Sequence, residues 1–194
     1  MPYRGKTGLI LFLLALLPAC TGREMLFNGG SAAGEAVMQQ RGFSGATSDY
    51  RLRLAISEAW FHYSIDLFQR ASLMISEGDV LIIGRVPDDL TRFQAALLAR
   101  EAGANRLTNA LTTGPDFSWQ QKLQDSAITG QIESALVFDA DVSALNYDVE
   151  TRGGIVYLTG EAASTRELRR VSFIAANTKG VVRVENHVHL PESR

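Results

Sequence analysis

Residues 147–160 read Tyr147-Asp148-Val149-Glu150-Thr151-Arg152-Gly153-Gly154-Ile155-Val156-Tyr157-Leu158-Thr159-Gly160. At the start of this stretch, Tyr147 and Val149 alternate with acidic residues, which is the two-residue period of a half-buried strand. The glycine pair after Arg152 favours a tight turn, because glycine adopts the positive φ that short hairpin loops require. A β-rich apolar run follows the turn and ends at Gly160. The pattern predicts a β-hairpin.

Two helices and a third strand are expected around this hairpin. Ser164 is followed three residues later by Glu167, the spacing of a capping box, so a helix should begin there. Before the hairpin, Asp125 can cap a helix with apolar residues on one face. After the second helix, residues 182–190 alternate between apolar and polar side chains, as in a strand with one wet face. The order helix, strand, strand, helix, strand predicts helices packed on one face of a small sheet.

An earlier part of the chain repeats this pattern. Adding 76 to the residue number maps Asp49 onto Asp125 and Gly84 onto Gly160. The same offset relates Leu52, Ile56, Ala59 and Trp60 to Ile128, Ile132, Ala135 and Leu136. Further on the offset becomes 77, and the gap is expected within the second helix. Such a repeat predicts two tandem domains, at 49–114 and 125–190, joined by a connector at 115–124 and followed by a tail at 191–194.

The N-terminus has the features of an exported protein. Arg4 and Lys6 precede an apolar run of nine residues, and small residues follow it. The run is too short to span a membrane, so residues 1–19 are expected to be a signal peptide. The only cysteine, Cys20, comes directly after Ala19, which resembles the lipobox of bacterial lipoproteins. The alternative is a soluble exported protein with an unpaired thiol.

Glycines and scattered polar residues fill residues 20–48 and predict a flexible tether between the lipid and the domains. Removal of residues 1–19 takes Arg4 and Lys6 away, so the formal net charge falls from −2 to −4. This mild acidity argues against a general nucleic-acid-binding surface. With its single cysteine assigned to lipid, the chain should form no internal disulfide and no cysteine metal cluster.

The glycine turn, Gly160, the capped helix and the sequence Lys179-Gly180-Val181-Val182-Arg183-Val184 together resemble the BON domain. Two such domains behind a lipobox resemble the dual BON-domain outer-membrane lipoproteins of the DolP type. The resemblance implies an α+β fold of two αββαβ domains, each with helices on one face of a three-stranded mixed sheet. It also implies anchoring through Cys20 at the periplasmic face of the outer membrane, binding of anionic phospholipid, and a role in outer-membrane integrity.

In the family, the first helix of the second domain makes the main lipid contact. On this chain that helix carries Ile128, Ile132, Leu136 and Val137, which become candidate lipid-binding residues. The alternative is that the apolar face of this helix belongs to the domain core. Relatives can carry an exposed tryptophan early in this helix, where this chain has Ala127.

The second helix offers another candidate surface. Arg166, Arg169 and Arg170 cluster there, and Phe173 falls opposite the apolar face. Basic side chains beside an exposed aromatic ring could hold an anionic headgroup. The alternative is an ordinary solvated helix face, with Phe173 packed on the neighbouring domain.

Neither catalysis nor a cofactor is expected. His187 and His189 share one strand face, but no third metal ligand is evident nearby, and a solvent-facing strand explains them without a metal. No serine has the context of a nucleophile. Three functional hypotheses remain: a phospholipid-binding envelope lipoprotein, a periplasmic adaptor that binds another envelope protein, and an undiagnosed hydrolase. The first accounts for most of the features above.

Overall fold

The computed structural model describes residues 32–190, with side chains described from Gly45 except at residue 46. The expected signal peptide, Cys20 and the tail at 191–194 lie outside the described residues. The chain divides into two compact units, Met1–Val37 and Met38–Arg194, and the contacts below all belong to the second unit.

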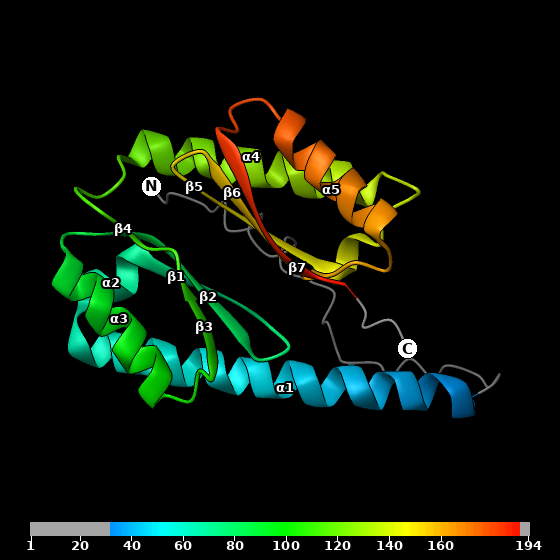
Figure 1. The fold of residues 1–194 in the computed structure, drawn as a ribbon, viewed down its shortest axis with the longest axis horizontal. Helices are drawn as coiled ribbons and strands as arrows, with labels where there is room; N and C mark the ends of the chain where they lie inside the picture. Colours follow the sequence, from blue (N-terminus) through cyan, green and yellow to red (C-terminus); the bar gives the residue numbers. More distant parts are fainter. Residues whose placement is uncertain (1–31, 191–194) are drawn as a thin grey trace, which may run out of the picture. The chain divides into compact units, whose positions relative to one another are not determined.

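Two successive halves make up the described chain (Figure 1). The first half contains α1 (Ala32–Tyr63), α2 (Ile65–Arg70), β1 (Ala71–Ser76), β2 (Asp79–Val86), α3 (Asp89–Glu101), β3 (Arg106–Asn109) and β4 (Thr112–Thr113). The second half contains α4 (Trp119–Val137), the 3₁₀ turn η1 (Ala144–Asn146), β5 (Tyr147–Arg152), β6 (Ile155–Glu161), α5 (Thr165–Asn177) and β7 (Arg183–His189). The predicted α+β class is confirmed.

The second half has the predicted mixed sheet of three strands in the order β5-β6-β7. The hairpin strands β5 and β6 run antiparallel, and β7 lies parallel to β6. Helices α4 and α5 cover one face of this sheet (Figure 1). Between helices and sheet lies a core built from Ile128, Ile132, Leu136, Val149, Val156, Leu158, Val171 and Ala175.

The first sheet departs from the three-stranded prediction because it has four strands. Strands β1 and β2 are antiparallel and β3 is parallel to β2, as in the second half. The eight-residue β2 extends beyond β3, and the chain returns to it through β4, where Arg85 and Val86 pair with Thr112 and Thr113. The extra strand therefore satisfies a part of β2 that β3 leaves open.

The sequence predicted that Asp125 caps α4, and this prediction is wrong. Asp125 lies inside the helix and is almost fully buried. The helix begins six residues earlier, where the Ser118 hydroxyl accepts a hydrogen bond from the amide of Gln121 at 3.2 Å. Part of the expected connector at 115–124 is therefore helical. The carboxylate of Asp125 instead accepts the backbone amides of Gly153 and Gly154, at 2.7 and 2.9 Å.

Asp49 makes the same pair of contacts in the first half. Its two carboxylate oxygens accept the amides of Glu77 and Gly78, both at 2.9 Å. These amides are the counterparts of those of Gly153 and Gly154 at an offset of 76. In both halves a carboxylate on the first helix thus accepts the amides of the hairpin turn. The two halves therefore share a contact between elements that are distant in sequence.

The strands and helices follow the same repeat. The pairs Ala71–Gly84 and Tyr147–Gly160 occupy equivalent places in the two hairpins. Helices α3 and α5 both have 13 residues and correspond at an offset of 76 from end to end. The gap expected within the second helix lies instead in the turn that follows it, before Gly103 and Gly180. An insertion in a turn leaves the packed face of the helix unchanged.

Helix α1 begins at Ala32, so residues 32–48 of the expected flexible tether are helical. The C-terminal part of this helix packs in the first core through Ile56 and Trp60, and the Trp60 indole donates to the carbonyl of Ala95 at 3.0 Å. Adding residues to a helix that is already nucleated costs far less than starting one. The packed part can therefore extend toward the N-terminus despite the glycines there.

The two halves contact each other within this unit. Met74, Leu81 and Ile83 of the first half form a buried cluster with Tyr157 of the second. Arg152 also donates a hydrogen bond to the Ser72 hydroxyl at 2.5 Å. Both β1 and β2 are consequently buried on two faces, which explains why their sequence lacks the alternation of a half-exposed strand.

Candidate functional site

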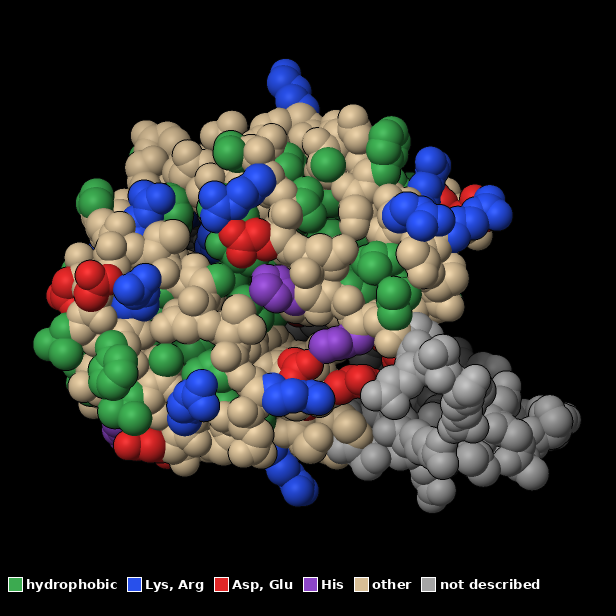
Figure 2. Space-filling model, viewed as in Figure 1, with side chains coloured by type: hydrophobic (Ala, Val, Ile, Leu, Met, Phe, Trp, Pro, Cys, Tyr) green, Lys and Arg blue, Asp and Glu red, His purple; other side chains and the backbone are tan. Residues whose placement is uncertain are grey.

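The basic side chains predicted on the second helix do gather on one exposed face of α5. Arg166, Arg169, Arg170 and Phe173 are spaced by three or four residues along this helix, so they are neighbours on its surface. All four are exposed, and Phe173 keeps 59% of its surface accessible. Figure 2 shows a cluster of basic side chains with acidic ones beside it on this part of the molecule.

The local sequence explains why this helix begins where it does. The Ser164 hydroxyl accepts the amide of Glu167 at 3.2 Å, as the capping box predicted. The Glu167 carboxylate reaches back to the amide of Ala163 at 2.9 Å and also accepts the amide of Ser143 at 2.7 Å. Glu167 therefore fixes the start of α5 to the loop that follows α4, which places the arginines beside that loop.

Acidic residues of this loop pair with two of the three arginines. The Arg170 guanidinium lies 2.8 Å from the Asp139 carboxylate, and this hydrogen bond lowers the pKa of Asp139 below its ordinary value. Arg166 lies 3.9 Å from Asp141 in a looser, exposed pair. Within the described chain Arg169 makes no ion pair, so it is the arginine whose charge is least compensated.

Two apolar side chains lie next to this basic face. Val137 and Phe138 end α4 with 65% and 86% of their surface exposed. Because Asp139 pairs with Arg170, the end of α4 lies close to α5. We call Val137, Phe138, Arg166, Arg169, Arg170 and Phe173 the α5 surface. Phe138 was not among the residues predicted from the sequence, although its signal is an aromatic residue just past the last apolar position of the helix.

The remaining candidates on α4 are not at the surface. Ile128, Ile132 and Leu136 are at most 2% exposed and belong to the second core. The prediction that they contact lipid is therefore wrong for the folded domain, and the alternative that they form the core is confirmed. Their spacing placed them on one helical face, but it did not say that the sheet covers that face.

The equivalent face of the first half has a different chemistry. At an offset of 76, Leu90, Phe93 and Leu97 of α3 occupy the positions of Arg166, Arg169 and Phe173. Leu90 and Phe93 are largely exposed, at 65% and 63%, and Leu97 is also exposed. The repeat thus presents an apolar helix face in one half and a basic one in the other.

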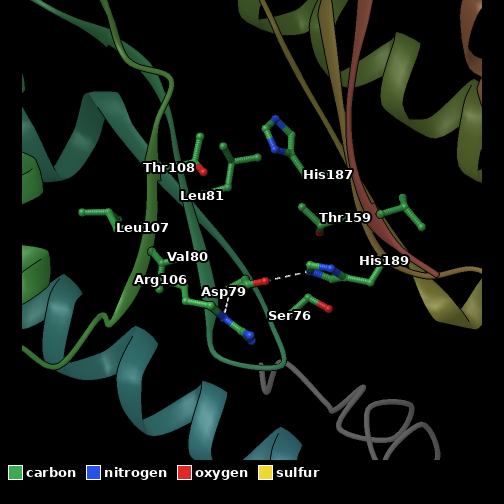
Figure 3. A pocket seen from close by; sticks show the side chains of 11 residues that line it. Ser76, Asp79, Val80, Leu81, Arg106, Leu107, Thr108, Thr159, His187 and His189 are labelled. Atoms are coloured by element: carbon green, nitrogen blue, oxygen red, sulfur yellow. Dashed lines mark ion pairs between the residues drawn. The ribbon is translucent and has the colours of Figure 1, made fainter. Parts of the chain in front are cut away.

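His187 and His189 do not simply face solvent. Both line a hollow of about 390 Å³ that residues of both halves enclose (Figure 3). The His189 imidazole lies 2.9 Å from the Asp79 carboxylate, which also pairs with Arg106. Among the described residues, no group of three or more histidine, cysteine, aspartate or glutamate side chains is placed to hold a metal ion.

Within residues 32–190, no helix has both the length and the apolar content needed to cross a bilayer. Cys20, the predicted lipidation site, lies outside the described residues.

Comparison with known proteins connects this arrangement to a family. The model of the BON domain matches residues 124–192. An uncharacterized protein in the gshII 5′ region of Anaplasma centrale is 32% identical over 148 residues, which are 75% of this chain and 97% of that protein. The outer membrane lipoprotein DolP of Haemophilus influenzae is 27% identical over 181 residues, 92% of each chain. A 21 kDa hemolysin of Actinobacillus pleuropneumoniae is 32% identical over 123 residues, 61% of this chain and 63% of that one.

Proposed function

We propose that this chain, which belongs to the DolP-type family of BON-domain proteins, is a cell-envelope lipoprotein that binds anionic phospholipid. It is anchored through acylated Cys20 at the periplasmic face of the outer membrane, where it helps to keep that membrane intact. The proposal assigns no catalysis and no cofactor to the chain. Its location is supported by the relative from Haemophilus influenzae, which is named as an outer membrane lipoprotein.

The proposal includes two tandem BON domains. The BON-domain model matches the second half. We assign the first half to the same domain type because its contacts are equivalent to those of the second half. Asp49 and Asp125 close equivalent turns, and the strand pairs Ala71–Gly84 and Tyr147–Gly160 match. The fourth strand, β4, is an addition to the first domain that leaves the shared strand order intact.

The exposed basic and aromatic side chains of the α5 surface are the main support for phospholipid binding. Arg169 offers an uncompensated positive charge, and Arg166 and Arg170 flank it with partly compensated ones. Each cation near an anionic bilayer contributes about 1 kcal/mol of binding free energy. Phe138 and Phe173 are exposed aromatic rings of the kind that settle at headgroup depth. Together these groups suit the surface of an anionic bilayer.

Vesicle flotation tests the proposal. The chain lacking residues 1–19, with Cys20→Ser to remove the anchor, is mixed with vesicles of neutral phospholipid alone or with added anionic phospholipid. We expect flotation with the anionic vesicles only, and we expect salt to weaken it, because screening reduces attraction between exposed charges. Failure to float with anionic vesicles at low salt would disprove phospholipid binding by these domains.

Two variants locate the binding surface. Arg169→Ala should weaken binding about fivefold, the equivalent of one cation at a charged surface. Arg100→Ala is the matched control, because it removes an exposed arginine from α3, the equivalent helix of the other half. Equal weakening by both variants would indicate attraction to net charge and not to the α5 surface.

The anchor and the envelope role need tests in cells. Cys20→Ser should abolish incorporation of labelled palmitate and make membrane association sensitive to salt. Loss of the gene should increase entry of large antibiotics that an intact outer membrane excludes. Equal palmitate incorporation by the Cys20→Ser protein would refute the lipid anchor, and an unchanged antibiotic barrier would refute the integrity role.

An adaptor that binds another envelope protein is the second candidate, and the α3 face favours it. Leu90, Phe93 and Leu97 form an exposed apolar stripe, which is more typical of protein contacts than of binding to a charged headgroup. Site-specific crosslinking from Phe93 in cells distinguishes the two functions. A discrete crosslinked protein, together with no flotation, would favour the adaptor.

A further inference from the structure

The hollow between the two halves has features of a ligand site that is separate from the α5 surface. Strands β2 and β3 supply one wall and strands β6 and β7 the other (Figure 3). Leu81 supplies the apolar side chain of the hollow, because Val80 and Leu107 pack in the first core and Val188 packs against the second. Its volume of about 390 Å³ is sufficient for a small organic molecule.

The charged side chains in this hollow are already paired with one another. The Asp79 carboxylate contacts Arg106 of its own half and His189 of the other half, the latter at 2.9 Å. Figure 3 shows this group on one side of the hollow, with His187 farther along the same strand as His189. A bound molecule would thus meet a carboxylate that already has two partners, of which Arg106 carries a positive charge.

The uncharged polar groups in the hollow lack partners. Thr159 is 4% exposed, and its hydroxyl makes no hydrogen bond in the described structure. A buried hydroxyl without a hydrogen-bond partner is unfavourable, so a ligand that forms a hydrogen bond with it would stabilise the folded protein. Within residues 45–190, the side chains of Thr108 and Ser76 likewise form no hydrogen bond, and both line the same hollow. Each of these three hydroxyl groups can donate a hydrogen bond.

The balance of charge selects the kind of ligand. The ionisable residues lining the hollow are Asp79, Arg106, His187 and His189. Their net charge is zero when both histidines are neutral and positive when either is protonated. Nearby, Glu185 lies 4.0 Å from His187 but is itself paired with Arg183 at 2.6 Å. Because the one carboxylate of this lining is already paired, the hydroxyl and imidazole groups are left as hydrogen-bond donors for an oxyanion.

We propose that this hollow binds a small molecule in which a carboxylate or phosphate is joined to a short apolar skeleton. The oxyanion accepts hydrogen bonds from the Thr159 hydroxyl and the His187 imidazole, and the skeleton lies against Leu81. The ligand contacts both halves and so stabilises their contact. This inference is independent of phospholipid binding by the α5 surface.

The test follows the three histidines of the full chain by NMR in neutral detergent. The probes are butyrate and butyl phosphate, with butanol and butyramide as uncharged counterparts. We expect one or both anions to shift His187 and His189 saturably. His62, exposed on α1, serves as the internal control and should not shift. The anion that causes the shift shows whether the site binds a carboxylate or a phosphate. No saturable shift by either anion, or equal shifts by the uncharged probes, would overturn the proposal.

Substitutions separate this site from nonspecific binding. Thr159→Val should lower the affinity for the anion that binds about tenfold, because valine lacks the hydroxyl but keeps the shape of threonine. Thr113→Val removes an exposed hydroxyl from β4 and should have no effect. Should Thr159→Val fail to fold, Thr108→Val provides a second test on the opposite wall. Unchanged affinity in the folded variant would overturn the proposal, whereas Arg169→Ala should leave this binding intact and reduce only flotation.

Discussion

The Asp125 carboxylate, on helix α4, accepts the backbone amide of Gly154 at 2.9 Å across 29 residues of sequence. Its second oxygen accepts the neighbouring amide of Gly153, so one side chain satisfies both donors of the hairpin turn. Asp49 makes equivalent contacts with the amides of Glu77 and Gly78. A tertiary contact of this kind joins the first helix to the hairpin in each half.

Replacing these two aspartates should have unequal effects. Asp125→Ala leaves two amides without their acceptor at a buried position and should reduce the free energy of unfolding by roughly 3 kcal/mol. Asp49→Ala should cost about 1 kcal/mol, because its turn is partly exposed and water can replace the carboxylate. Urea unfolding of the two variants measures the difference. Equal losses would contradict the role assigned to burial.

Gly160 should tolerate no side chain. A Cβ atom there would lie 1.9 Å from the carbonyl oxygen of Asn146, and the backbone φ of +119° is one that other residues rarely adopt. Gly160→Ala should therefore destabilise the fold by about 3 kcal/mol or more.

Gly130→Ala is the control for this substitution. Gly130 lies in α4 with open space around its Cβ position, so alanine should stabilise the helix by roughly 0.5–1 kcal/mol. Chemical denaturation of both variants gives the two values, and a loss of stability in Gly130→Ala would argue against the described helix.

Stability should decline at alkaline pH because of Tyr147. Burial, followed by the negative charge of Glu167, raises the pKa of this phenol well above its ordinary value. The folded state thus favours the neutral phenol, whereas the unfolded chain ionises near pH 10. The resulting stability is present below that pH and is lost as the pH rises beyond it. The loss should be on the order of 1 kcal/mol at pH 11.

Unfolding experiments from pH 8 to 11 check this expectation. Burial also raises the pKa of Tyr157, so Tyr147→Phe should reduce the alkaline loss without removing it. Tyr50→Phe, at an exposed position on α1, is the control and should follow the original chain. An unchanged pH profile in Tyr147→Phe would refute the assignment.

Asp139 should restrain binding to anionic vesicles. It neutralises Arg170, so Asp139→Asn should free one cation and strengthen flotation about fivefold. Asp89→Asn is the matched control, because Asp89 pairs with Arg92 on α3 at 3.0 Å, away from the α5 surface. A comparable gain in that control would mean that net charge alone governs binding.

Local sequence was sufficient for several elements of the fold. The alternation before Gly153 predicted β5, and the spacing of Ser164 and Glu167 predicted the start of α5, because both signals depend on neighbours in the chain. The repeat at an offset of 76 predicted equivalent halves, and the turns at Asp49 and Asp125 agree with it. The exposed arginines of α5 were also predicted, since their spacing places them on the side of the helix away from its apolar face.

Tertiary structure decided which apolar residues are accessible. Ile128, Ile132 and Leu136 were candidates for lipid contact with the core as the alternative, because a helical pattern identifies a face but not what covers it. Asp125 resembled a helix cap since its true partners lie 28 and 29 residues away. His189 and Asp79 meet only when two strands from different halves pack together. Sequence determined the elements and their repeat through short-range periodicity and capping, whereas the surfaces and the hollow arose from long-range packing that no local pattern encodes.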